Sequence, residues 1–474
     1  MLIALIDDGI DKSAFPEVKL IMDLSVTANC TVKQRTYDEP ILTNHGTTCA
    51  KIITKYSPTA EFCSLRIFHS EVLSASCDQL VAALKWCYEQ KVPIIHLSVG
   101  TSHLCDYSKI RQIIAKIVGQ RQVVIAAHNN INPYSLPACL AGVFGVALDD
   151  RLLGKNYKIA VESSEMHYIQ ASSFHEIIDG AGVPSTTQLS NSYAAPTITA
   201  AIHTLLQKHI PFTLPIPHVY HMLAHSIDVP CWMHPDFIDD AYILNLSGIE
   251  LLKEHLFFRR RRIYTSFPLN AVPCHEETSL VYLPPQGESE AQTMDVLIRN
   301  KNFAAFERIL YGGVLPINIK QMLGPKLVWS EDRPVPCSDN VGVSEVESDC
   351  PVINIYGEGI CSVAILCQLR DLFLTNGYQC FALCDYPFAY LYGLEFYVKT
   401  SNISSVIAKV KEQYRPDVIL SYSHIKNGVV NQYSEVCYVE IITDANVDFK
   451  EYLPLKNVEK DIISAYQAIV DCYS

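Results

Sequence analysis

The sequence has no uninterrupted apolar run of the roughly 18 residues that a membrane-spanning helix needs. Its apolar start, Leu2–Ile6, follows Met1 directly and lacks the basic flank of a secretory signal peptide. Neither membrane insertion nor export is therefore indicated. We expect a cytoplasmic protein that has no membrane partner.

A surplus of positive charge is also missing. The 474 residues include 37 Lys and Arg against 50 Asp and Glu, which gives a formal net charge of -13. Such a protein repels the phosphate backbone, so nucleic acid is not an expected partner. Apolar residues make up 49% of the chain, which suffices for the cores of two or three domains.

Cysteine pairs of the C-x-x-C type are absent, although the sequence contains 17 cysteines. Their scatter offers neither a zinc-binding nor a thioredoxin-like motif. Disulfide frameworks belong mainly to small exported chains, so we expect most of these cysteines to be reduced and to fill apolar cores. No metal or other cofactor is predicted, and the oligomeric state stays open.

Residues 1–210 alternate short apolar runs with amphipathic helical patterns. One helix is expected from about Ser76, where Gln79 completes a capping box. The alternation predicts a doubly wound, mostly parallel α/β sheet, which binds ligands at the carboxyl ends of its strands. The expected strands, each apolar throughout as in a sheet covered on both faces, are Leu2–Ile6, Phe62–Phe68, Ile94–Ser98, Val123–Ala127 and Val143–Ala147.

Residues 211–349 are less regular and leave two possibilities open, a small middle domain or an extended packing arm. The segments Pro284–Gln292 and Ser330–Asp349 have the composition of linkers. The basic run Arg259–Arg262 follows an apolar segment that we expect to be helical. Either this run clamps an acidic peptide, or it is the solvated end of a helix, where positive charge is favoured.

Residues 350–474 show a second strand and helix alternation, which predicts a smaller Rossmann-like α/β domain with a substrate-binding or a regulatory role. The motif Gly357-Glu358-Gly359 follows its first strand. No Gly-Lys-Ser/Thr closes a phosphate loop there, and Ser362 stands where a dinucleotide fingerprint needs a third glycine. We therefore predict no nucleotide cofactor. The expected elements are strands Val352–Tyr356, Cys380–Cys384 and Val418–Tyr422, a helix ending at Asn376, and a helix over Ile403–Tyr414.

Three short motifs follow one another in the order Asp, His, Ser. Ile6-Asp7-Asp8-Gly9 closes the first strand, Asn44-His45-Gly46 opens a helix, and Ser190-Asn191-Ser192 opens another. A serine hydroxyl becomes a strong nucleophile when an imidazole takes its proton, and the imidazole needs a carboxylate to fix its tautomer. The motifs therefore predict a catalytic triad of Asp7, His45 and Ser192.

A fourth motif places an amide side chain at the end of a buried strand. Val123–Ala127 leads into His128-Asn129. The Asn129 side chain and the backbone N–H of Ser192, at the start of a helix, are the expected donors to an oxyanion.

In these motifs the sequence resembles the subtilisin family of serine proteases, over roughly residues 1–210. The resemblance assigns Asp7, His45 and Ser192 to the triad and Asn129 to the oxyanion hole. It assigns Ser98-Val99-Gly100 to the strand that lies beside the substrate backbone. It implies a subtilisin-like fold and the hydrolysis of peptide bonds.

The sequence departs from the family pattern in three places. Ser190-Asn191 stands where the family usually has Gly-Thr, His128 where it has Gly, and Asp8 where it has Ser or Thr. The first two replacements raise the question whether the oxyanion hole keeps the geometry of the family.

The region of about 350–400 resembles the companion proteins found beside subtilisin-like proteases in bacterial peptide-maturation systems of the bacteriocin type. This resemblance implies that protease and companion are fused here. It also implies a ribosomally made precursor peptide as the substrate, whose leader is removed. The shared features are Gly357-Glu358, Gln368-Leu369, Gly377-Tyr378 and Leu391-Tyr392-Gly393.

Three functions stay open. The chain is a processing protease for one dedicated peptide, a general intracellular protease, or a catalytically impaired protein that binds a peptide without cleaving it. Asp7 lies so close to the start of the sequence that we expect no inhibitory pro-segment before it. This favours the dedicated protease, because a broadly active enzyme without such a segment would digest its own cytosol.

Overall fold

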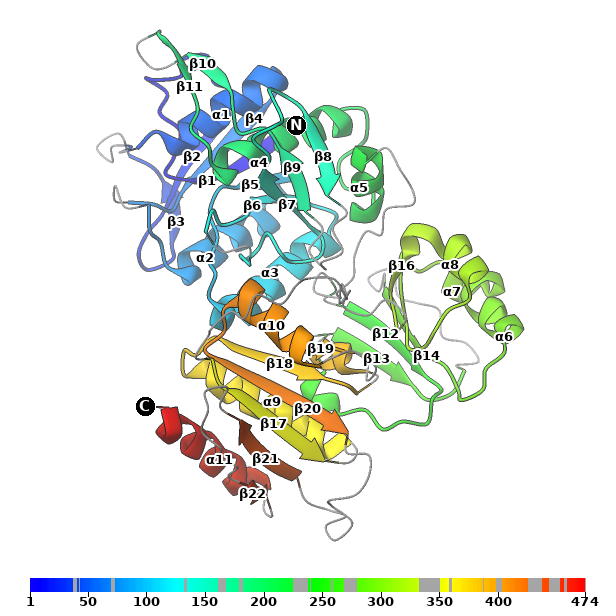
Figure 1. Ribbon diagram of the computed structural model, residues 1–474. Helices are drawn as coiled ribbons and strands as arrows, with labels where there is room; N and C mark the ends of the chain where they lie inside the picture. Colours follow the sequence, from blue (N-terminus) through cyan, green and yellow to red (C-terminus); the bar gives the residue numbers. More distant parts are fainter. Residues whose placement is uncertain are drawn as a thin grey trace.

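The chain folds into three larger β-sheets, each covered by helices, and a small hairpin in the part that the structure, a computed structural model, describes (Figure 1). The described residues are 1–36, 41, 43–69, 73–131, 134–160, 168–178, 182–224, 238, 240–256, 258, 260–267, 279–331, 350–357, 360–386, 388–397, 403–424, 437–442, 452–455 and 458–473.

The first sheet has the strand order β3-β2-β4-β1-β5-β6-β7-β9-β8. All neighbouring strands are parallel except β3 and β8, which lie antiparallel at the two edges. The predicted mostly parallel α/β sheet is therefore confirmed, and its five predicted strands are β1, β4, β5, β6 and β7. The bounds are β1 Leu2–Asp7, β2 Leu20–Val26, β3 Val32–Gln34, β4 Glu61–Arg66, β5 Ile94–Leu97, β6 Val123–Ala127, β7 Val143–Leu148, β8 Tyr157–Ala160 and β9 Tyr168–Ala171.

Helices cover both faces of this sheet. Helix α1 (His45–Tyr56) contacts α4 (Asn191–Leu206), and α2 (Cys77–Glu89) contacts α3 (Tyr107–Gly119) on the other side (Figure 1). The chain leaves β1 toward β2 and β4 and then builds β5, β6 and β7 on the opposite side of β1. The strand order therefore reverses at β1, and such a reversal is where open α/β sheets bind ligands.

Two further elements extend this part of the molecule. The hairpin of β10 (Glu176–Ile178) and β11 (Pro184–Thr186) precedes α4 in the chain. Helix α5 (Ile216–Ala224) packs against α4 and buries Ile216, Val219 and Tyr220. The core of the first sheet therefore includes residues up to this helix.

The middle of the chain forms a second, fully parallel sheet of order β13-β12-β14-β15-β16. The sequence left open a small middle domain or an extended packing arm here, and the division of the chain into domains stays a prediction. The elements are β12 Asp240–Asn245, η3 Lys253–His255, β13 Arg260–Tyr264, β14 Ser279–Leu283, α6 Glu290–Met294, η4 Asp295–Arg299, α7 Lys301–Ala304, β15 Arg308–Tyr311, α8 Ile317–Leu323, η5 Gly324–Lys326 and β16 Leu327–Ser330.

Side chains alternate across this middle sheet and give it two different neighbours. Tyr242 and Tyr282 belong to a core with the helices of the middle region, whereas Ile243 and Val281 join the large core shared with the other two sheets. Successive strand residues point to opposite faces, so one face receives the helices and the other is free to pack elsewhere. This second face packs against the C-terminal part, because the ring centroids of Trp329 and Tyr390 lie 3.7 Å apart.

Two expectations for the middle region are wrong. The basic run does not end a helix, because residues from Arg260 onward form β13, which pairs with β12. The expected linker Pro284–Gln292 comprises the short connection from β14 to α6 and the first turn of α6, whose start has a capping box between Ser289 and Gln292. Pro, Gly and Ser mark a tight βα turn as well as a linker, and composition alone does not separate the two. Most of Ser330–Asp349 lies outside the described residues.

The C-terminal sheet is mixed, with order β19-β18-β20-β17-β21-β22. Strands β17, β18, β19 and β20 are parallel, and β21 runs antiparallel to β17. The expected strands and helices are present, while a Rossmann-like domain stays a prediction. Two residues of the predicted Gly357-Glu358-Gly359 turn, Glu358 and Gly359, lie outside the described residues. The bounds are β17 Val352–Gly357, α9 Ile360–Thr375, β18 Cys380–Cys384, η6 Ala389–Tyr392, β19 Glu395–Phe396, α10 Ile403–Tyr414, β20 Val418–His424, β21 Cys437–Ile442, β22 Tyr452–Leu455 and α11 Val458–Tyr473.

None of the helices in the described ranges combines the length and the apolar character that a membrane crossing requires.

The predicted capping box of α2 is confirmed and allows a test of this element. The Ser76 hydroxyl accepts the Gln79 N–H at 3.2 Å, and the Gln79 side chain accepts the Ser76 N–H at 3.0 Å. Ser76→Ala removes the first of these bonds and should lower the free energy of unfolding by about 1 kcal/mol. A urea titration measures the change. Ser74→Ala, at an exposed position two residues earlier, is the control, and an equal effect of both variants would contradict the capping role.

Candidate active site

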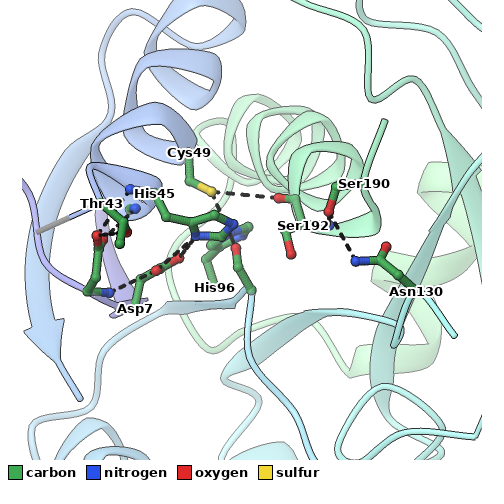
Figure 2. A network of polar contacts seen from close by, with 11 residues as sticks. Asp7, Thr43, His45, Cys49, His96, Asn130, Ser190 and Ser192 are labelled. Carbon is green, nitrogen blue, oxygen red and sulfur yellow. Dashed lines mark hydrogen bonds and ion pairs between the residues drawn. The ribbon is translucent and has the colours of Figure 1, made fainter. Parts of the chain in front are cut away.

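Asp7 and His45 meet at the point where the strand order reverses. Asp7 ends β1 and is fully buried, and His45 is the first residue of α1. The Nδ1 atom of His45 lies 2.9 Å from each carboxylate oxygen of Asp7 (Figure 2). Because a carboxylate only accepts hydrogen bonds, Nδ1 carries the hydrogen, and Nε2 of the neutral ring is left as the basic atom.

The carboxylate sets the charge state of the imidazole. Burial of the ring lowers the pKa of His45, but the attraction of Asp7 and its hydrogen bond outweigh burial, so the pKa lies above the usual 6.5. The side chain of His45 is 15% exposed, so part of the ring is accessible from outside. The ring is thus both oriented and made more basic by Asp7.

Asp8 holds the start of α1 in place. Its carboxylate accepts the backbone N–H of Gly46 at 2.7 Å and of His45 at 3.1 Å, and the Thr43 hydroxyl at 2.5 Å. Adjacent residues at a strand end point in opposite directions, so Asp7 faces the imidazole while Asp8 faces the helix terminus. A carboxylate is favoured there by the unpaired N–H groups and the helix dipole. Asp8 therefore has a structural reason to replace Ser or Thr.

Ser192 lies in the first turn of α4, half-buried, beside the imidazole. In Figure 2 the His45 ring lies between Asp7 and Ser192. The ring of Tyr193 packs on that of His45 with centroids 5.2 Å apart. Within the described residues the Ser192 hydroxyl has no hydrogen-bond partner. Such a contact often tightens only when substrate binds.

A chain of polar contacts continues beneath the imidazole. The Cys49 sulfur lies 3.3 Å from the Ser98 hydroxyl, which lies 2.9 Å from Nε2 of His96, and His96 Nδ1 lies 2.7 Å from the Thr199 hydroxyl. Burial lowers the pKa of His96 to about 4, so this ring is neutral and structural. The chain ties Ser98 to α1 and α4.

One group of side chains could in principle hold a metal ion. Ligand atoms of Asp7, His45 and Cys49 lie within 4.8 Å of one another. Burial and then the charge of Asp7 raise the pKa of Cys49 well above its usual value, and a thiol binds metals only after it loses its proton. The group therefore fits a protonated thiol beneath a histidine better than a metal centre.

The predicted substrate strand follows β5 directly. Ser98 and Val99 are half-buried and Gly100 is exposed. Thr101 pairs with Leu136 through two backbone hydrogen bonds of 2.9 and 2.7 Å. A Cβ on Gly100 would lie 2.6 Å from the Leu136 carbonyl, so only glycine fits at this approach. In the described part of the chain, Val99 and Gly100 make no backbone hydrogen bond, which leaves their peptide groups available to a ligand strand.

The two expected oxyanion donors have different surroundings. Asn129 is exposed at the end of β6; its side-chain oxygen accepts the Ile131 N–H at 2.8 Å, so its amide nitrogen is the donor end. The N–H of Ser192 is already engaged, because it donates to the Ser190 hydroxyl at 3.2 Å. Glycine at position 190, as the family usually has, would leave that N–H unoccupied.

The replacements Asn191 and His128 are accommodated by the surrounding backbone. Asn191 is buried and accepts the Leu148 N–H at 2.7 Å, and it donates to the carbonyls of His128 and Asn129 at 3.1 and 3.0 Å. The His128 ring turns inward, where Gly145 leaves room for it: a Cβ at that glycine would lie 2.7 Å from Nε2 of His128. Both side chains are therefore accommodated in the interior of the protein.

The C-terminal part touches both segments that flank the site. The Gln379 side chain donates to Nδ1 of His103 at 3.0 Å and accepts the N–H of Leu104, just after the substrate strand. The Tyr414 ring lies 4.8 Å from that of Tyr134, in the segment that follows Asn129. The sequence offers no signal for these contacts, because about 275 residues separate the partners in each case.

Comparisons with known proteins find similar structures only. No protein-family model matches the sequence, and no curated protein matches it. A lanthipeptide protease has a TM-score of 0.36 at 14% identity, over 47% of this chain and 78% of its own. The prenylagaramide maturation protease PagA has a TM-score of 0.37 at 20% identity, over 51% of this chain and 86% of its own.

The nisin leader peptidase NisP from Lactococcus lactis has a TM-score of 0.36 at 14% identity, over 47% of this chain and 81% of its own. A cold-adapted subtilisin-like serine proteinase has a TM-score of 0.34 at 15% identity over 47% of this chain. The structural neighbours of the chain are thus subtilisin-like proteases, and several of them process leader peptides. Each likeness covers about half of the present chain. At TM-scores below 0.5 these likenesses carry no argument, and the function rests on the side chains described above.

Proposed function

We propose that the chain is a subtilisin-like serine endopeptidase of the cytoplasm, with Asp7, His45 and Ser192 as its triad. The observation that carries the proposal is the double contact of 2.9 Å between Nδ1 of His45 and the buried Asp7 carboxylate. It leaves Nε2 as the basic atom on the side of the ring where Ser192 lies (Figure 2). A cytoplasmic location agrees with the eleven cysteines that are free thiols among the described residues.

In this proposal the hydroxyl oxygen of Ser192 attacks the carbonyl carbon of the scissile bond while Nε2 of His45 takes its proton. The C=O electron pair moves onto the oxygen, and Asp7 stabilises the imidazolium. Collapse of the tetrahedral intermediate breaks the C–N bond, and His45 returns the proton to the amine that leaves. Water then repeats the sequence and releases the acyl group from Ser192.

We further propose that the substrate is a dedicated precursor peptide; two structural neighbours are named a maturation protease and a leader peptidase. The support comes from the segments around the proposed site. In the described part of the chain, Val99 and Gly100 make no backbone hydrogen bond, so a peptide can pair with them. From the C-terminal part, Gln379 and Tyr414 contact the two segments that flank the site. Binding energy from a remote part of a peptide can position the scissile bond. A general protease needs no such contacts.

Ser192→Ala should abolish hydrolysis, since it removes the attacking oxygen. The substrates are labelled casein and a library of quenched fluorescent peptides. Ser185→Ala, on β11, is the matched control and should keep wild-type activity. Cleavage by the Ser192 variant would rule out the triad. Casein degraded as fast as the best peptide would favour the general protease over the processing enzyme, and binding of a peptide without cleavage by the wild type would favour the impaired protein.

Asp7→Asn should lower kcat about 10⁴-fold, because an amide no longer fixes the required tautomer. The variant should also change the pH profile. His45 must be neutral to take a proton, so activity rises as pH increases through its pKa, which Asp7 holds above 6.5. The acid limb of kcat/KM should therefore lie above pH 6.5 in the wild type and move to lower pH in the variant. A limb that stays in place would show that His45 is not the titrating base.

Gln379→Ala should weaken substrate binding, because it releases the segment that follows the substrate strand. We expect KM for the best library peptide to rise about tenfold or more while kcat changes little. Gln286→Ala, at an exposed loop position, is the control. Equal KM values for the two variants would contradict a role of the C-terminal part in the cleft.

A further inference from the structure

One hydrogen bond at the start of α4 would be absent from an oxyanion hole that used the Ser192 N–H. The Ser192 N–H, which is the expected second donor, points to the hydroxyl oxygen of Ser190 at 3.2 Å. Ser190 is the N-cap of the helix, so this bond helps to fix the start of the helix. An N–H that already has an acceptor close by is a weaker donor for an oxyanion.

The Ser190 oxygen accepts a second hydrogen bond, from the Asn130 side chain at 3.3 Å (Figure 2). The orientation of that amide is fixed, because its oxygen accepts the backbone N–H of Asn191 at 2.9 Å. The NH₂ end of Asn130 is therefore the end that faces Ser190. Asn130 and Ser192 both donate to the same oxygen.

A hydroxyl group has two lone pairs and one hydrogen. Both lone pairs of Ser190 are occupied, so its hydrogen has to point away from Asn130 and Ser192. Across the described part of the chain no acceptor is found for that hydrogen. Two donors on one oxygen also polarise its O–H bond and strengthen it as a donor. The half-buried Ser190 therefore presents an oriented donor two residues from the proposed nucleophile.

We propose that the Ser190 hydroxyl donates to the oxyanion in place of the Ser192 N–H, with Asn129 as the other donor. The inference rests on the proposed function. When Ser192 attacks the carbonyl carbon, the negative charge that forms on the carbonyl oxygen is stabilised by the Ser190 hydrogen, which stays covalently bound to its own oxygen. The Ser192 N–H and Asn130 act through Ser190 and are positioning groups.

The test compares Ser190→Ala with Ser190→Thr in the full-length protein. Alanine removes the hydroxyl and frees the Ser192 N–H, whereas threonine keeps a hydroxyl. We expect Ser190→Ala to lower kcat about a hundredfold with KM nearly unchanged. Threonine should restore most of the loss. If Ser190 only caps the helix, alanine should leave kcat unchanged or raise it, because the N–H becomes available. That result would overturn the inference.

Two further measurements keep the test decisive if Ser190→Ala folds poorly. The inhibition constant of a peptide boronic acid, which imitates the tetrahedral intermediate, should rise by the same factor as kcat falls once it is corrected for the folded fraction, which circular dichroism measures. Asn130→Ala removes an exposed side chain and should lower kcat about tenfold. Wild-type values in both measurements would also overturn the inference.

The proposed function is tested apart from this inference by the wild-type protein alone. A fluorophosphonate probe should label Ser192, and mass spectrometry of a digest locates the adduct. Absence of both labelling and hydrolysis would overturn the proposed function itself. An active, labelled wild type together with a fully active Ser190→Ala variant would overturn only the role of Ser190.

Discussion

The buried carboxylate of Asp7 and its hydrogen bond to His45 are the contact on which the site depends. Burying a carboxylate away from water is costly unless hydrogen bonds compensate for the lost hydration. His45 and the backbone N–H of Asp8 supply these hydrogen bonds to Asp7. Asp7 can stay at that position because β1 lies inside the first sheet, paired with β4 on one side and β5 on the other. The reversal of strand order at β1 then opens the space in which the imidazole lies.

The second constraint is the rigidity of the start of α4. Asn191 joins this helix to the ends of β6 and β7 through three hydrogen bonds, and Ser190 and Asn130 add a further connection. Polar side chains therefore hold the start of this helix in place through hydrogen bonds. The consequence is chemical as well as structural, because one of the bonds that hold the helix start also occupies the N–H of Ser192.

The three sheets share one large apolar core, and the C-terminal part also contacts the two segments that flank the proposed site. The middle sheet packs against the C-terminal part with one face, and β18 brings Gln379 to the segment after the substrate strand. Thr101 and Leu136 join the two segments that the C-terminal part contacts. A peptide held by that part would thus meet two segments that are already joined to each other.

The sequence by itself determined the buried parallel strands, the capping box of α2 and the pairing of His45 with Asp7, because each depends on local pattern or motif order. The assignment of Ser192 to the same group stays a prediction. The sequence did not reveal β2, the neighbour of the edge strand β3, because Asp23 and Ser25 interrupt the apolar pattern there, nor that Arg260–Tyr264 is a strand. Only the tertiary structure decided that the Ser192 N–H is occupied by Ser190 and that Gln379 touches His103 and Leu104. Those contacts depend on hydrogen-bond direction and on chain segments hundreds of residues apart, which no local pattern records.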